Sequence, residues 1–143
     1  MAVLNPYLNF RGTAREALTF YQAILGGELT TSSYAEMGGL EQMGVKESEA
    51  EWLMHGMLVV SDSINLMGAD VPTAHGDSIE NGHISLSGSA DDEAFLRDAF
   101  AKLADGGELH VPLEKAPWGD YFGQTADKFG VKWLVNIAGA PSS

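Results

Sequence analysis

The chain has 143 residues, with 20 acidic and 8 basic side chains and a formal net charge of -12 at pH 7. This length predicts one domain, and the negative charge argues against binding to nucleic acid or to an anionic membrane surface. The absence of cysteine excludes disulfides and thiolate metal ligands. The chain begins without a signal-peptide pattern, and no stretch approaches the roughly 20 apolar residues of a membrane span. We therefore expect a cytoplasmic protein.

A repeated order of strand and helix signals is the most informative feature of the sequence. Residues 5–29 read NPYLNFRGTAREALTFYQAILGGEL, and residues 81–109 read NGHISLSGSADDEAFLRDAFAKLADGGEL. Both segments begin with Asn, continue with alternating apolar residues, pass through Gly-Thr-Ala or Gly-Ser-Ala, and end in Gly-Gly-Glu-Leu. Because a repeat of this kind indicates duplicated structural units, we predict two similar halves.

The first half is expected to start with a strand in which Leu8 and Phe10 share one face. A helix near Thr13–Leu25 should follow, with Thr13 and Glu16 forming a capping box and Gly26 ending the helix. Its apolar stripe comprises Ala14, Ala17, Leu18, Tyr21 and Leu25. Three further strands are predicted at Glu28–Tyr34, Trp52–Val60 and Ser63–Met67.

Two polar segments interrupt this pattern. Residues 35–50 form an insertion, which we interpret as a mobile loop near a site or as a plain surface loop. Its glutamates are expected to be solvated: Glu36, Glu41, Glu47, Glu49 and Glu51. Residues 68–82 are rich in Gly, Pro, Asp and Ser and are expected to link the halves.

The second half repeats the order of elements. Ile84 and Leu86 should face a helix near Asp91–Ala104, while His83 and Ser85 face the other way. Ser89 with Asp92 or Glu93 should cap this helix, and its apolar stripe comprises Phe95, Leu96, Ala99, Phe100 and Leu103. Strands are predicted at Glu108–Leu113, Tyr121–Thr125 and Lys132–Ile137.

The predicted fold class is therefore α+β, with two tandem βαβββ modules in one domain spanning residues 1–143. The first repeat covers residues 1–70 and the second covers residues 81–139, with the linker at residues 68–82 between them.

Three stretches resemble the PhnB-like branch of the vicinal oxygen chelate superfamily, which includes glyoxalases, extradiol dioxygenases and bleomycin- and fosfomycin-resistance proteins. They are PYLNFRGTAREALTFYQAILGGEL (Pro6–Leu29), MHGMLVVSDSINLMGAD (Met54–Asp70) and PWGDYFGQTADKFGVKWLVNI (Pro117–Ile137). The resemblance implies curved half-barrel sheets with helices outside, a cavity on the concave faces, and a homodimer. Parts of this branch carry a ubiquinone-methyltransferase label, but no GxGxxG-type turn follows a strand here to support it.

Metal-binding members of this superfamily take four ligands, mostly His and Glu, from the first and last strands of the two halves. Position by position, the resemblance places one strong ligand here, His83. The remaining positions hold Tyr7 or Asn5, Asn65 or Met67, and Leu134 or Asn136. A single imidazole does not hold zinc, nickel or iron tightly. A divalent metal is therefore not assigned, and His83 is the candidate ligand if one binds.

His83 and His55 are the candidate catalytic residues, as an acid/base pair near neutral pH or as plain strand-end histidines. The candidate substrate-binding residues are aromatic and amide side chains that suit a largely apolar ligand: Tyr7, Asn9, Trp118, Tyr121 and Asn136. His83 is expected to exchange a proton only if a carboxylate such as Asp120 lies near it. Trp133 is expected in the core, and Asp127 in the turn before the last strand.

These residues support a protein with a cavity for a small, largely apolar molecule. One alternative is a metal-dependent lyase, isomerase or dioxygenase, which the incomplete ligand set disfavours. A second is a binding protein that sequesters a molecule without chemistry, as resistance proteins do. A structural dimer whose cavity has lost its function is the third.

Overall fold

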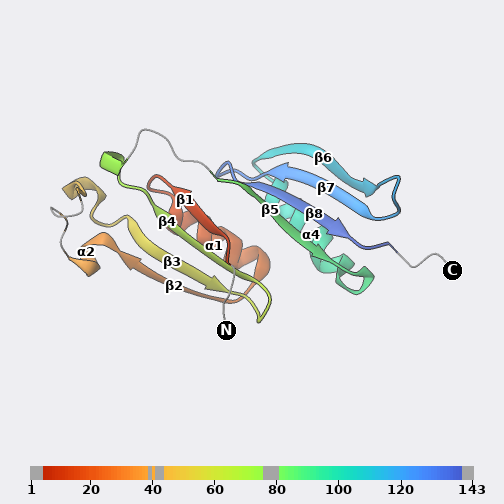
Figure 1. Ribbon diagram of the computed structural model, residues 1–143, viewed down its shortest axis with the longest axis horizontal. Coiled ribbons are helices and arrows are strands. Elements are labelled where there is room, and N and C mark those ends of the chain that lie inside the picture. Colours follow the sequence, from red (N-terminus) through yellow and green to blue (C-terminus); the bar gives the residue numbers. More distant parts are fainter. Residues whose placement is uncertain (1–4, 39, 41–43, 76–80, 140–143) are drawn as a thin grey trace. The chain divides into compact units, whose positions relative to one another are not determined.

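In the computed structural model, residues 5–38, 40, 44–75 and 81–139 are described. The chain divides into two compact units, Met1–Asn81 and Gly82–Ser143. Each unit contains one four-stranded sheet and one long helix (Figure 1). The predicted α+β architecture of two βαβββ modules is confirmed. No helix in the described part is long and apolar enough to cross a membrane.

The first unit has a mixed sheet with the strand order β1-β4-β3-β2, in which β1 and β4 are parallel. Its strands are β1 (Tyr7–Phe10), β2 (Glu28–Ser33), β3 (Leu53–Val59) and β4 (Asn65–Asp70). Its helices are α1 (Ala14–Leu25), the short α2 (Tyr34–Met37), and the 3-10 turns η1 (Glu47–Glu49) and η2 (Thr73–His75). Strand β4 runs to Asp70, so residues 68–70 of the expected linker belong to the sheet.

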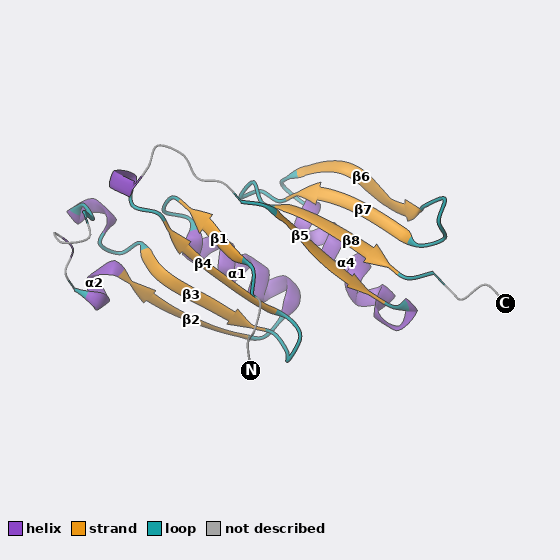
Figure 2. Ribbon diagram, in the orientation of Figure 1, coloured by secondary structure: helices purple, strands orange, loops and turns teal. Residues whose placement is uncertain are grey.

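The second unit has the same arrangement, with the strand order β5-β8-β7-β6 and parallel β5 and β8. Its strands are β5 (His83–Gly88), β6 (Glu108–Lys115), β7 (Tyr121–Ala126) and β8 (Lys132–Ile137). The 3-10 turn η3 (Ala90–Asp92) leads into α4 (Glu93–Ala104). In each unit the long helix lies across one face of its own sheet (Figure 2).

The long helices bury the predicted apolar stripes, with one exception. All five predicted stripe residues of α1 are buried, and so are Leu96, Ala99, Phe100 and Leu103 of α4. Phe95, however, is 40% exposed, so its inclusion in the stripe was wrong. The buried residues of α4 follow the spacing i, i+3, i+4 and i+7, and Phe95 precedes this row by one residue, which turns it away from the sheet.

The start of α1 is held by a distant carboxylate instead of the predicted capping box. Thr13 makes no side-chain capping bond among the described residues. Asp70, 2% exposed, accepts hydrogen bonds at Oδ1 from the backbone N–H groups of Gly12 (2.7 Å) and Ala14 (3.0 Å). Its Oδ2 accepts from the N–H of Leu53 at 2.9 Å. The last residue of β4 thus fixes the starts of α1 and β3.

Glu49 was wrongly placed among the solvated glutamates. It is 3% exposed, and its carboxylate accepts from the N–H of Lys46 and from both the N–H and the hydroxyl of Thr73, the last at 2.8 Å. Burial opposes ionisation of Glu49, but the hydrogen bonds from Thr73 and Lys46 outweigh it and lower its pKa. The insertion is therefore tied to the segment after β4 through this carboxylate. Glu41 lies outside the described residues.

Two local predictions for the second unit are confirmed. Ser89 and Asp92 form the reciprocal capping pair at the start of η3, with Ser89 N–H donating to Asp92 Oδ2 at 3.0 Å. Asp127 builds the turn before β8 by accepting from the N–H of Phe129 (2.8 Å) and of Val131 (3.1 Å). Trp133 is 2% exposed and donates from Nε1 to Asp127 Oδ2 at 2.9 Å, so it is a core residue.

We predict that Asp70→Ala lowers the free energy of unfolding by about 3 to 5 kcal/mol, because it leaves three buried N–H groups without an acceptor. Asp70→Asn should cost less, since it keeps one acceptor oxygen. Urea denaturation followed by circular dichroism measures both changes.

Asp62→Ala is the matched control, because Asp62 is an exposed carboxylate in the turn between β3 and β4. It should change stability by no more than about 0.5 kcal/mol. Equal losses from Asp70→Ala and Asp62→Ala would contradict the role assigned to Asp70.

Candidate functional site

The sheet face opposite α1 is identified by two glycines on the other face. A Cβ on Gly56 would lie 2.5 Å from Leu18 Cδ1 of α1, and one on Gly68 would lie 3.6 Å from the same atom. Because side chains alternate along a strand, Met57 and Met67, the neighbours of these glycines in sequence, point away from α1. We call this the helix-free face of the first sheet.

A row of side chains crosses this face. The strand pairing places Met57 opposite Met67, Met67 opposite Tyr7, and Met57 opposite Thr30. Directly opposed residues bring their Cβ atoms to roughly 5 Å, so the two thioethers and the phenol are neighbours. Tyr7 is 48% exposed, and partial burial raises its pKa. The row offers an apolar, adaptable surface with one hydroxyl at its edge.

His55 and Asn9 flank this row. His55 pairs with Ser32 on β2 and lies two residues before Met57, on the same face. Asn9 lies two residues after Tyr7, and its backbone N–H and C=O bond to the Asn81 side chain at 2.8 and 2.9 Å. The Asn81 side chain thus provides hydrogen-bond partners for the backbone N–H and C=O of Asn9 in β1. The first unit therefore brings three predicted site residues, Tyr7, Asn9 and His55, onto one face.

His83 has the predicted orientation. His83 and Ser85 are exposed, whereas the alternate residue Leu86 is buried and pairs with buried Val135. The imidazole thus lies on the face of the second sheet away from α4, which is the helix-free face of that sheet. Whether it contacts a ligand stays a prediction.

Asp120 does not serve as the carboxylate partner of His83. His83 pairs with Lys132 at one end of β8, and Asp120 bonds Asn136, which lies four residues, or about 13 Å, along the strand. The N–H of Gly139 donates to Asp120 Oδ1 at 3.0 Å, and the Asn136 amide donates to Oδ2 at 3.2 Å. These two bonds, with Gly139 contributing more, lower the pKa of Asp120. Its carboxylate orients Asn136.

Trp118 and Asn136 lie near Asp120, on the helix-free face of the second sheet. Phe122, which the sequence analysis did not single out, lies beside them. Phe122 pairs directly with Asn136, and the Trp118 ring meets the Phe122 ring edge-on with centroids 6.0 Å apart. Trp118 is 64% exposed. The alternation of β7 indicates that Phe122 is on this face, but only the pairing register shows that it faces Asn136. We call Trp118, Phe122, Asn136 and Asp120 the aromatic corner.

Tyr121 does not belong to this corner. It alternates with Phe122 and so shares the α4 side of β7 with Gly123 and Thr125, which are buried. The guanidinium carbon of Arg97 on α4 lies 4.9 Å from the centroid of the Tyr121 ring. Trp118 and Tyr121 therefore lie on opposite faces of the sheet, and a substrate-binding role for Tyr121 stays a prediction.

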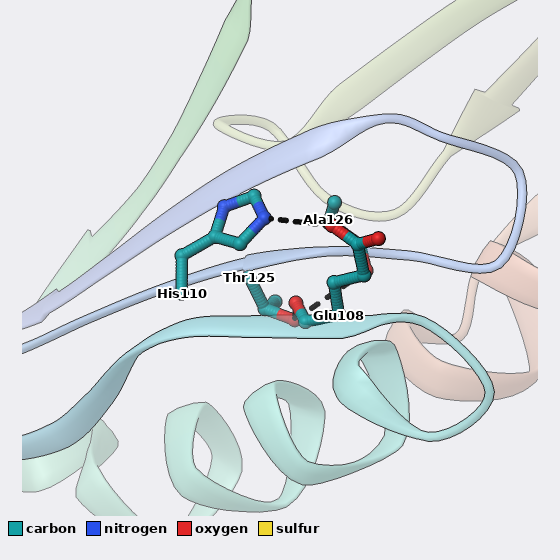
Figure 3. Close-up of polar contacts among 4 residues, drawn as sticks. All are labelled: Glu108, His110, Thr125 and Ala126. Atoms are coloured by element: carbon teal, nitrogen blue, oxygen red, sulfur yellow. Dashed lines mark hydrogen bonds and ion pairs between the residues drawn. The ribbon is translucent and has the colours of Figure 1, made fainter.

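A second histidine lies on this sheet at its outer strand. His110 Nε2 is 3.2 Å from Glu108 Oε2, and Glu108 also accepts at its backbone oxygen from the Thr125 hydroxyl at 2.7 Å (Figure 3). Glu108 pairs with Ala126, which pairs with Lys132. The sequence interpretation gave His110 no role. The register of β6 against β7 shifts between Leu109 and Val111, so the strand is irregular at His110.

The residues at the expected metal-ligand positions do not fit a transition-metal centre. His83 stands alone as an imidazole ligand, while Leu134 offers a hydrocarbon and Met67 a thioether. The Asn65 side-chain oxygen is buried without a hydrogen-bond partner among the described residues, but one neutral amide oxygen adds little affinity for zinc, nickel or iron. No group of three His, Asp or Glu side chains in the described ranges is arranged to hold a metal ion.

Fold and site together define a protein of two βαβββ units with polar, aromatic and thioether side chains on the helix-free sheet faces. Residues 4–135 match the family described as the Glyoxalase/Bleomycin resistance protein/Dioxygenase superfamily, so the chain belongs to this superfamily. This is the superfamily that the sequence resemblance indicated.

Three similar proteins support the PhnB-like branch. The crystal structure of PA1353 from Pseudomonas aeruginosa is 32% identical, covers 98% of this chain and 100% of its own, and has a TM-score of 0.81. The PhnB protein from Bacillus cereus is 25% identical over 96% of this chain and 100% of its own, with a TM-score of 0.70. Protein YjdN of Escherichia coli strain K12 is 28% identical over 94% of each chain.

We predict that the purified protein retains less than about 0.1 equivalent of any transition metal after incubation with Zn(II), Ni(II) or Mn(II) and dialysis, because it lacks a set of strong ligands. Inductively coupled plasma mass spectrometry measures the content. His83→Ala is the matched variant, and it should leave the content unchanged. One equivalent of metal in the wild type that disappears in His83→Ala would contradict this account of the ligand positions.

Proposed function

We propose that the chain binds a small, largely apolar molecule on its helix-free sheet faces. The observation that carries the proposal is the aromatic corner, where an indole is held against Phe122 but remains 64% exposed. An exposed large aromatic side chain that is fixed in place supplies a flat apolar contact surface at little cost in conformational entropy. Membership of a superfamily named after glyoxalases, bleomycin-resistance proteins and dioxygenases supports a small molecule as the ligand.

The backbone around Trp118 explains why the indole is held. Ala116 N–H donates to the Asp120 carbonyl at 2.7 Å, and Gly119 N–H donates to the Ala116 carbonyl at 2.9 Å, which closes the turn that carries Trp118. Gly119 has φ = +101°, a conformation that residues with a Cβ rarely adopt. The turn therefore fixes the backbone that carries Trp118, and the ring contact with Phe122 places the indole.

Polar specificity would come from Asn136 and His83. Asp120 takes a hydrogen bond from the Asn136 amide nitrogen, which directs the amide so that its oxygen can accept from a ligand. His83 can donate or accept at neutral pH. Few polar groups on a mostly apolar surface are typical of small-molecule sites.

Taken by itself, the helix-free face of the first unit offers apolar contact to a ligand of its own through Met57, Met67 and Tyr7. Thioether side chains adapt to differently shaped ligands because they have several rotatable bonds and a polarisable sulfur. His55 and the Asn9 side chain would supply hydrogen bonds beside this row. These properties favour a sequestering role without chemistry, as in resistance proteins. The position of His83 favours the alternative, a metal-dependent lyase, isomerase or dioxygenase, which the metal measurement above tests.

We predict that Trp118→Ala weakens binding of N-phenyl-1-naphthylamine, a neutral apolar fluorophore, by about fivefold, which corresponds to the loss of one aromatic contact. The increase in fluorophore emission on titration of the full-length protein gives the dissociation constant.

Phe95→Ala is the matched control, since Phe95 is an exposed aromatic residue on α4, on the other side of the second sheet. It should leave the dissociation constant within about twofold of the wild type. Equal weakening by both variants would show nonspecific apolar binding and would overturn the assignment of the aromatic corner.

We also propose that the chain acts in the cytoplasm as a homodimer, as the family resemblance implies. Each sheet has outer strands whose backbone groups need covering, and a closed twofold assembly is the commonest way to cover such surfaces. We expect sedimentation velocity at tens of micromolar to give about twice the monomer mass of 15.3 kDa. A single monomeric species under these conditions would contradict the dimer.

A further inference from the structure

The α4 side of the second unit contains a groove that the proposed function does not use. It has a volume of about 290 Å³ and runs between α4 and β6. Its walls include Ala101 and Ala104 of α4 and Leu109 and Leu113 of β6. This volume lies at the lower end of the range of small-molecule sites, roughly 300 to 1,000 Å³. Leu109 is 56% exposed, so the groove leaves apolar surface in contact with solvent.

The groove results from the irregular course of β6. The pairing of β6 with β7 shifts register between Leu109 and Val111 and again between Val111 and Glu114. Such irregularities bend a strand. Phe100 fills the space over Gly123, where a Cβ would come within 2.7 Å of its ring. The small side chains Ala101 and Ala104 leave the space beside Phe100 open.

One end of the groove carries positive charge. Arg97, which lines the groove, donates from Nε to Glu93 Oε2 at 2.7 Å and stacks over Tyr121. Its guanidinium has further N–H donors on the two terminal nitrogens. Lys115 pairs with Tyr121 across β6 and β7 and is exposed on the same side of the sheet. Arg97, Lys115 and Glu93 together carry a formal charge of +1, in a chain whose total charge is -12.

We propose that this groove binds an amphiphile with an apolar chain and an anionic head group, of the class of medium-chain carboxylates. The chain would lie along the alanines of α4 and the leucines of β6. The carboxylate would meet the Arg97 guanidinium, which binds planar carboxylates with two parallel hydrogen bonds. A strand of a second protein is a poorer occupant, because Pro112 and the two register shifts make β6 a weak template for strand addition.

The site is distinct from the aromatic corner, since Trp118 and Asn136 lie on the opposite side of the sheet from α4. The two proposals can therefore fail separately. Trp118→Ala should weaken N-phenyl-1-naphthylamine binding and leave decanoate binding unchanged.

Sodium decanoate is the probe, and decanol is its neutral counterpart. Titration into the ¹⁵N-labelled full-length protein, followed by NMR, should shift the amide signals of Ala101, Ala104, Leu109 and Leu113. Arg97→Gln should weaken decanoate binding by about fivefold, as expected for the loss of a charge-assisted hydrogen bond, and leave decanol binding unchanged. Ala101→Phe should fill the groove and weaken the binding of both probes.

Lys102→Gln is the matched control. Lys102 is another cation of α4 with an acidic partner four residues before it, Asp98 at 2.8 Å, and it does not line the groove. This variant should bind decanoate as the wild type does. Thermal denaturation checks that every variant is folded.

Any of three results would overturn the proposal. The first is no decanoate binding at about 1 mM, a concentration equivalent to about 4 kcal/mol of affinity. The others are equal weakening of decanoate binding by Arg97→Gln and Lys102→Gln, and amide signal shifts confined to the helix-free faces. If Arg97→Gln alone does not fold, Arg97→Lys serves in its place. It keeps the charge but loses the bidentate geometry, and should weaken decanoate binding more than decanol binding.

Discussion

The buried carboxylate of Asp70 is the interaction on which the first unit depends. Its two oxygens accept from the backbone of Gly12, Ala14 and Leu53, so one side chain fixes the entry of α1 and the start of β3 against the end of β4. The Tyr34 hydroxyl donates to the Asp70 carbonyl at 2.7 Å and attaches the start of α2 to the same point. Because α1 covers one face of the sheet, this anchor also decides which face is left free of the long helix.

The sequence predicted the elements well because their signals are local. Alternating apolar residues located β1 and β5, and the apolar stripe located α1, whose predicted bounds are close to those observed. The predicted capping box of α1 and the predicted solvent exposure of Glu49 were wrong for the same reason. A buried carboxylate accepts hydrogen bonds from whichever donors lie near it in the folded chain. The donors to Asp70, and Thr73 as a donor to Glu49, lie 17 to 58 residues away in sequence.

The candidate site was predictable to the extent that alternation within a strand defines a face. That rule placed His83 correctly. It also assigns Tyr121 and Phe122 to opposite faces, but which of the two shares a face with Asn136 depends on how β7 pairs with β8. The turn between β7 and β8 contains Gly130, whose φ of +86° only the structure reveals. Which residues are neighbours on adjacent strands, such as Met57 and Met67, therefore became known only from the strand pairing in the structure.

The two units use one scaffold for different surface chemistry. Core positions correspond between the repeats, because Leu8 and Phe10 are buried as Leu86 is. The helix-free faces differ. The first face carries two thioethers with Tyr7, and the second carries His83 and the aromatic corner. Within its own unit, His83 has Lys132 as its neighbour across the strand pair, while the Asp120 carboxylate is bonded to Asn136, about 13 Å further along β8, and to Gly139. A histidine that acts as a general base usually relies on an acidic group to orient its imidazole. The strand pairing thus places a cation, Lys132, directly opposite His83.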